Sequence, residues 1–174
     1  MKKILFLLFA AAAFAACNDD GEPKVRYATT NDGIENGYLQ GANLHFYGTS
    51  TVTDAKGETF TDPEAWFEFA GGPESFSLYM HKTRFAANMP GVEMRLQTVT
   101  YTPKGDKSLN FVREEIIPSA LKENNEGGGS SYQLVERYKI TNLTGAIDGV
   151  DCRVSFTCAG VFQVIYEGRL IIKE

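Results

Sequence analysis

The segment from Val150 to Cys158 reads VDCRVSFTC and alternates apolar and polar residues at every position. The alternation returns in VFQVIYEGRLII, from Val161 to Ile172, where one row of phenylalanine, valine, tyrosine and leucine is set against glutamine, glutamate and arginine. Residues two apart in a strand lie on the same face of a sheet. The pattern therefore predicts two strands that each bury one face and expose the other.

Six further segments with strand character precede these two, and turn residues such as Asp54–Gly57 and Pro103–Asp106 separate them. They span 38–52, 59–70, 75–85, 92–101, 109–117 and 132–143, with a loop over 119–130 that has room for one helical turn. An all-β chain of eight long strands favours an antiparallel up-and-down barrel, since closure removes the exposed edges. A β-sandwich is the alternative, because the strand number fits both architectures.

The two cysteines of the alternating segment, Cys152 and Cys158, share its apolar face. Six residues of continuous strand separate them by about 20 Å, whereas a disulfide needs Cα atoms within about 7 Å. We therefore predict two unpaired, buried thiols. A bulge at Cys152 would be the one way for them to approach each other.

The N-terminal segment has two lysines, Lys2 and Lys3, followed by an apolar stretch that is too short to span a bilayer. Phe14-Ala15-Ala16 then lead into Cys17, and this arrangement resembles a bacterial lipobox. The resemblance implies a signal peptide over 1–16, cleavage before Cys17 and acylation of that residue. Several acyl chains would anchor the protein to a membrane without a spanning segment. An ordinary secretory signal followed by a chance cysteine is the alternative.

An acidic cluster follows the cysteine, from Asn18 to Glu22. It resembles the surface-export signal of lipoproteins in the Bacteroidota, which implies a place on the outer face of the outer membrane. A solvated tether beside anionic head groups is the alternative. Residues 17–35 contain no apolar run and read as a flexible tether, so we expect the folded domain to span 36–174.

Several short motifs of the domain resemble the calycin-like (lipocalin-like) domain of Bacteroidota lipoproteins. They are Phe76–Tyr79, Phe85–Gly91, Tyr138–Gly145, the alternating strand from Cys152 to Phe156, and Val164–Gly168. The resemblance covers roughly the last 100 residues. It implies a barrel carried on a lipid anchor, and it implies no particular activity.

Composition and motifs argue against several classes of function. The formal net charge of −5 disfavours a protein that binds nucleic acid. His45 is expected on a solvated strand face, and neither it nor His81 has a metal ligand at a suitable spacing. Adjacent Glu114 and Glu115 point to opposite faces, and neither a Gly-x-Ser-x-Gly motif nor a phosphate-binding loop is present. We therefore expect a protein that is not an enzyme and holds no metal or cofactor.

The aromatic residues carry the remaining hypotheses. Phe67, Phe69 and Tyr166 are expected to face the barrel interior, where they could contact a small apolar ligand, while Trp66 and Tyr47 face outward. The first hypothesis is thus a binding module with an apolar ligand inside or at the mouth of the barrel. The second is a protein- or glycan-interaction module with a filled core that binds through Trp66 and Tyr47. The bulky inward residues favour a filled core.

Overall fold

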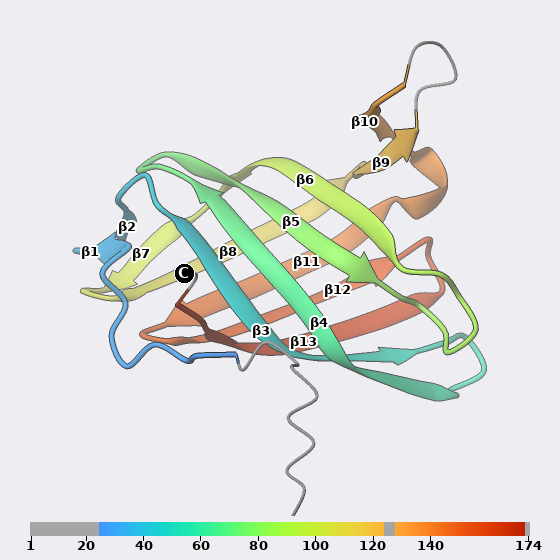
Figure 1. The fold of residues 1–174 in the computed structure, drawn as a ribbon, viewed down its shortest axis with the longest axis horizontal. Helices are drawn as coiled ribbons and strands as arrows, with labels where there is room; N and C mark the ends of the chain where they lie inside the picture. Colours follow the sequence, from blue (N-terminus) through green and yellow to red (C-terminus); the bar gives the residue numbers. More distant parts are fainter. Residues whose placement is uncertain (1–24, 124–127, 173–174) are drawn as a thin grey trace, which may run out of the picture.

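The computed structural model describes residues 25–123 and 128–172, and these form an all-β fold (Figure 1). The elements are β1 (Ile34–Glu35), β2 (Tyr38–Leu39), β3 (Asn43–Thr53), β4 (Thr59–Gly71), β5 (Ser75–Thr83), β6 (Val92–Thr100), β7 (Thr102–Gly105), β8 (Ser108–Ile116), β9 (Ser119–Glu123), β10 (Ser130–Leu134), the 3₁₀ turn η1 (Glu136–Tyr138), β11 (Ile140–Asp148), β12 (Asp151–Cys158) and β13 (Phe162–Leu170). Within this described part, no helix is long and apolar enough to cross a membrane. The predicted all-β class is confirmed.

The large sheet has the strand order β10-β9-β6-β5-β4-β3-β13-β12-β11-β8-β7, and all its pairs are antiparallel. It curls strongly, so that its buried face encloses one core (Figure 1). Consecutive strands β3 to β6 and β11 to β13 are neighbours, and β13 then pairs with β3. The last long strand of the chain therefore lies beside the first.

The two ends of this strand order come from one stretch of chain, which changes partner at Pro118. Before the proline, β8 pairs with β11; after it, β9 pairs with β6 through Met94–Ala120 and Arg95–Ser119. Proline cannot donate a ladder hydrogen bond, so the pairing is interrupted at Pro118, which is itself buried. The interruption lets a single stretch contact both sides of the curled sheet.

Four of the sequence-based boundaries are wrong. The segment predicted as one strand over 38–52 is divided between β2 and β3. The segment predicted as one strand over 132–143 is divided between β10, η1 and β11, because the chain turns where the Val135 N–H donates to the Pro118 carbonyl. The predicted loop over 119–130 begins with strand β9, which pairs with β10. The predicted turn at Pro103 lies in the short strand β7 at the end of the strand order, where proline is tolerated.

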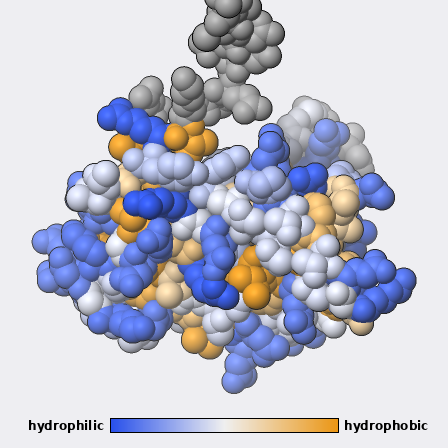
Figure 2. Space-filling model, turned by 90° about the horizontal axis from the view of Figure 1, so that it is seen from below, coloured by the Kyte–Doolittle hydropathy of each residue, from blue (hydrophilic) through white to orange (hydrophobic). Residues whose placement is uncertain are grey.

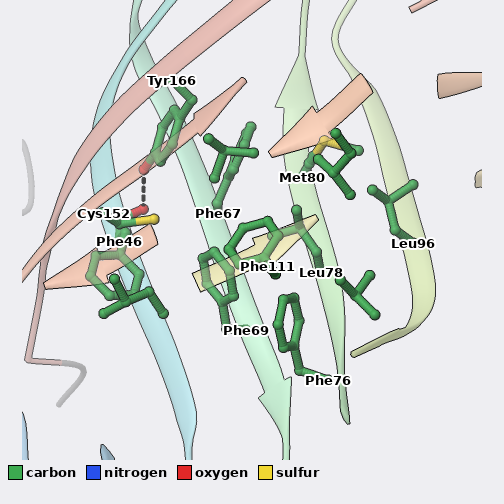
Figure 3. Close-up of a cluster of buried hydrophobic side chains, with 14 of the residues drawn as sticks. Phe46, Phe67, Phe69, Phe76, Leu78, Met80, Leu96, Phe111, Cys152 and Tyr166 are labelled. Carbon is green, nitrogen blue, oxygen red and sulfur yellow. Dashed lines mark hydrogen bonds between the residues drawn. The ribbon is translucent and has the colours of Figure 1, made fainter. Parts of the chain in front are cut away.

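The interior of the curl is packed with aromatic rings (Figure 3). Phe67 stacks on Tyr166 with ring centroids 3.8 Å apart. The ring centroids of Phe69 and Phe46 lie 5.5 Å apart in an edge-to-face arrangement. The Tyr166 hydroxyl donates a 2.7 Å hydrogen bond to the Phe46 carbonyl, and burial raises the pKa of this hydroxyl. The expected inward face is thus confirmed for these strands, and its large side chains fill the space between them.

Cys152 and Cys158 are both free and buried, as predicted. Strand β12 pairs with β13 from Asp151 to Cys158 without a register shift, so no bulge brings the two thiols together. Burial raises the pKa of Cys158 to about 12 and that of Cys152 well above its ordinary value. Both thiols therefore remain protonated in the folded protein at neutral pH.

Part of the segment assigned to the tether packs on the domain. Tyr27 forms a β-bridge with Ile171, the Ala28 N–H donates to the Leu170 carbonyl at 2.9 Å, and Ile34 is fully buried. These contacts fix the point at which the chain enters the sheet. Cys17 and the predicted signal peptide lie outside the described residues.

Candidate functional site

One row of polar and aromatic side chains crosses the outer face of five adjacent strands. Strand pairing places Asp151 opposite Arg169, Arg169 opposite Tyr47, Tyr47 opposite Trp66, and Trp66 opposite His81. We call these five residues the outer row. In each strand at least one adjacent residue is buried on the inward face, namely Cys152, Leu170, Phe46, Phe67 and Met80, so the row itself faces outward. Four strand spacings give it a length of about 19 Å.

Trp66 and His81 form one end of the outer row and are held by their neighbours. Their rings stack with centroids 3.5 Å apart and planes 10° apart. His81 Nδ1 lies 2.8 Å from Glu93 Oε2, and His81 Nε2 lies 3.3 Å from Glu68 Oε2. Two carboxylates and one indole thus hold the imidazole in place, so the His81 side chain has little conformational freedom.

A second row lies next to the first on the same outer face. Strand pairing places His45 opposite Glu68, Glu68 opposite Tyr79, and Tyr79 opposite Arg95. Glu68 Oε2 lies 3.8 Å from His45 Nδ1. The Arg95 guanidinium lies over the Tyr132 ring at 4.6 Å, a cation–π contact that connects β6 to β10. A carboxylate shared by two histidines therefore lies at the centre of a polar, aromatic surface.

His45 has the outward direction expected from its position in the strand, but the expectation of a solvated side chain is wrong. It is only 7% exposed. The ring of Trp66 lies 5.8 Å from it, and Glu68 is its direct partner on the same neighbouring strand, β4. Large neighbours on the next strand cover it, which strand direction alone does not reveal.

A groove of about 500 Å³ opens at the other end of the outer row. Its polar and aromatic lining residues come from β3, β11, β12, β13 and the N-terminal segment, and they are Tyr27, Tyr47, Asp148, Asp151, Arg153, Glu167 and Arg169. Arg153 forms an ion pair with Glu167 on the neighbouring strand. We call this the tyrosine groove, because Tyr27 and Tyr47 both line it.

The five residues predicted to contact a ligand or partner are divided between the two faces of the sheet. Tyr47 and Trp66 are cross-strand neighbours on the outer face. Phe67, Phe69 and Tyr166 are fully buried and contact other core side chains (Figure 3). The structure therefore places Tyr47 in the lining of the groove with Trp66 next to it, and it places the inward three in the packed core.

The partners of the outward pair were not predicted from the sequence; they are Arg169 and Asp151 on one side and His81 on the other. The alternation in the sequence did indicate part of this row, because Tyr79 and His81 face outward in their strand, as Trp66 and Glu68 do in theirs. Direction does not give register, however, and only the register shows which residues are adjacent. Glu114 and Glu115 are exposed, and Glu115 pairs with Lys139 at 3.1 Å.

Within residues 25–123 and 128–172, no group of three histidine, cysteine or carboxylate side chains is arranged to hold a metal ion. Seen from below, the molecular surface is largely hydrophilic, with small hydrophobic areas scattered over it (Figure 2). Comparisons with protein-family models, with curated proteins and with solved structures find no match for this chain.

Proposed function

We propose that this protein is a lipid-anchored binding module of the outer-membrane surface, which binds a partner outside the cell through the outer face of its sheet. The anchor is the acylated Cys17, and the acidic residues after it direct the protein to the cell surface. The curled sheet is a calycin-like barrel that acts as a rigid support. Catalysis is not part of this proposal.

One observation favours the outer face over an internal ligand. Phe67 and Tyr166, which were candidates to line a ligand cavity, stack on each other at 3.8 Å. A ligand between them would have to separate two rings in van der Waals contact and displace a buried hydrogen bond. Tyr47 and Trp66, in contrast, lie side by side on the outer face and beside an open groove. Aromatic residues with a polar tip are frequent at binding surfaces.

Two features support the calycin-like form of the domain. Strand β13 pairs with β3, and the stretch from β8 to β9 contacts strands on both sides of the curl. Both features reduce the number of exposed edges, as barrel closure does.

Anchoring is tested with Cys17→Ala in the full-length chain. The wild-type protein is expected to incorporate a fatty-acid label, to fractionate with the outer membrane and to be degraded by protease added to intact cells. Cys17→Ala is expected to lose the label and the membrane association. A wild-type protein without label would contradict the anchor, and protection from protease on intact cells would contradict surface display.

Binding through the outer face is tested by placing a photo-crosslinking amino acid at Arg169, which is exposed in the outer row. The expected result on intact cells is a crosslinked product that disappears when Trp66→Ala is added and persists with Tyr38→Ala. Tyr38 is a suitable control because it is an exposed residue of β2 that contacts Tyr101 and is not part of the outer row. Native mass spectrometry of the purified protein gives the opposing test. A bound mass of constant size that Trp66→Ala and Tyr47→Ala leave unchanged would refute the outer face and favour an internal ligand.

A further inference from the structure

The chemistry of the tyrosine groove identifies a class of ligand for this surface. We infer that the groove binds sugar rings of a neutral oligosaccharide, an inference that rests on the proposed outer-face function and makes it specific. Its volume of about 500 Å³ lies within the range of about 300–1,000 Å³ found for small-molecule sites.

The charges that line the groove nearly cancel. Three carboxylates, those of Asp148, Asp151 and Glu167, lie beside the two guanidinium groups of Arg153 and Arg169. Each arginine has an acidic neighbour across the β12–β13 pair, Glu167 for Arg153 and Asp151 for Arg169. A phosphate or sulfate would meet three carboxylates here, and a cationic ligand would meet two guanidinium groups. A neutral ligand encounters neither repulsion.

The same groups suit a ligand that is rich in hydroxyl groups. Ionised carboxylates only accept hydrogen bonds and guanidinium groups only donate them, whereas a hydroxyl group does both. A polyhydroxylated ring can therefore use acceptors and donors on one wall at the same time. An apolar ligand would leave these charged groups without water or partners, which is costly.

The two tyrosines supply the flat apolar surfaces that sugar rings need. Tyr27 is 46% exposed, and its backbone is held in place by the bridge to Ile171. Tyr47 is half-buried in β3. An aromatic face packs against the C–H groups of a pyranose. Because both residues lie on paired backbone, little backbone conformational entropy is lost on binding.

The site extends beyond one ring. From Tyr47 the outer row continues to Trp66 and His81, two strand spacings or about 10 Å farther. The indole edge and the carboxylates around His81 offer further contacts to the same ligand. This length favours an oligosaccharide over a single sugar.

The test uses the full lipidated chain in detergent micelles on a panel of immobilised polysaccharides. The neutral members are dextran, glycogen, mannan and xylan, and the acidic members are polygalacturonate and heparin. The expected result is binding to at least one neutral polysaccharide, with Tyr27→Ala at least tenfold weaker and Tyr38→Ala within twofold of wild type. Tyr27 and Tyr38 form a matched pair of variants, because the two residues are exposed to a similar extent, 46% and 44%. Their folding is compared by circular dichroism.

The inference is overturned if no neutral polysaccharide binds, if only acidic ones bind, or if Tyr27→Ala and Tyr38→Ala bind equally well. The Arg169 crosslinking experiment separates this failure from failure of the proposed function. If Arg169 crosslinks to a protein in a Trp66-dependent way and no polysaccharide binds, the sugar site is refuted. The outer-face function is not refuted by that result. An empty panel without any crosslink would refute both.

Discussion

The packing around Tyr166 gives a sharp test of the core. Gly168 lies two residues farther along β13 and faces the same interior, and the tyrosine ring bends back over it. A Cβ atom added at Gly168 would lie 2.6 Å from Tyr166 Cζ and nearer still to the hydroxyl oxygen. Contacts below 3.0 Å are essentially never seen for real Cβ atoms, so Gly168→Ala must displace the ring.

The expected cost follows from what the displaced ring loses. The buried hydrogen bond from Tyr166 to the Phe46 carbonyl is worth about 0.5–1.5 kcal/mol, and overpacking a core costs about 1–3 kcal/mol. Alanine also lowers the conformational entropy of the unfolded chain, and this stabilises the folded protein by about 0.4–1 kcal/mol. We therefore expect Gly168→Ala to lower the free energy of unfolding by about 0.5–4 kcal/mol. Domains typically have a free energy of unfolding of roughly 5–15 kcal/mol.

The assay is urea unfolding followed by the fluorescence of Trp66, the single tryptophan. Gly72→Ala is the matched control, because a Cβ there meets nothing within 4 Å and its φ is not in the left-handed region. That variant should be as stable as wild type or up to about 1 kcal/mol more stable. Tyr166→Phe should cost about 1 kcal/mol through the lost hydrogen bond alone. Equal stability of the two alanine variants would refute the close packing of Tyr166 on Gly168.

Three further outcomes are expected. The two thiols of β12 should react with a thiol reagent at pH 8 only after unfolding, because burial raises their pKa; rapid reaction of the native protein would contradict their burial. Arg84 donates two hydrogen bonds to Asp62 and lowers the pKa of that carboxyl below 3.8, so Asp62→Asn should reduce stability at pH 7. The ion pair stabilises the fold above the unfolded-state pKa and is lost as pH falls through the folded one, so the difference in unfolding free energy should shrink below about pH 4; a constant difference from pH 7 to 3 would contradict the pair. His81→Ala should shift the Trp66 emission to longer wavelength by uncovering one indole face, whereas unchanged emission would argue against the stack.

Much of the fold could be predicted because strand direction is a local property. In β12 and β13 the side chains alternate with a period of two, and the structure confirms the two faces and the separation of Cys152 from Cys158. The predictions failed where a distant partner decides the local structure. The chain turns at Val135 because its N–H bonds to Pro118, 17 residues earlier in the chain, and β9 forms because β6 and β10 lie on either side of it.

The candidate site divides in the same way. The amino-acid sequence by itself determined that Tyr47 and Trp66 face outward and that Phe67, Phe69 and Tyr166 face inward, since alternation fixes the face of each residue. Only the tertiary structure decided that Tyr47 and Trp66 are neighbours, that Arg169 and His81 continue their row, and that the inward rings stack on one another. Register depends on turns and on bulges such as the one between Gly48 and Ser50, and a shift of one residue would exchange the two faces.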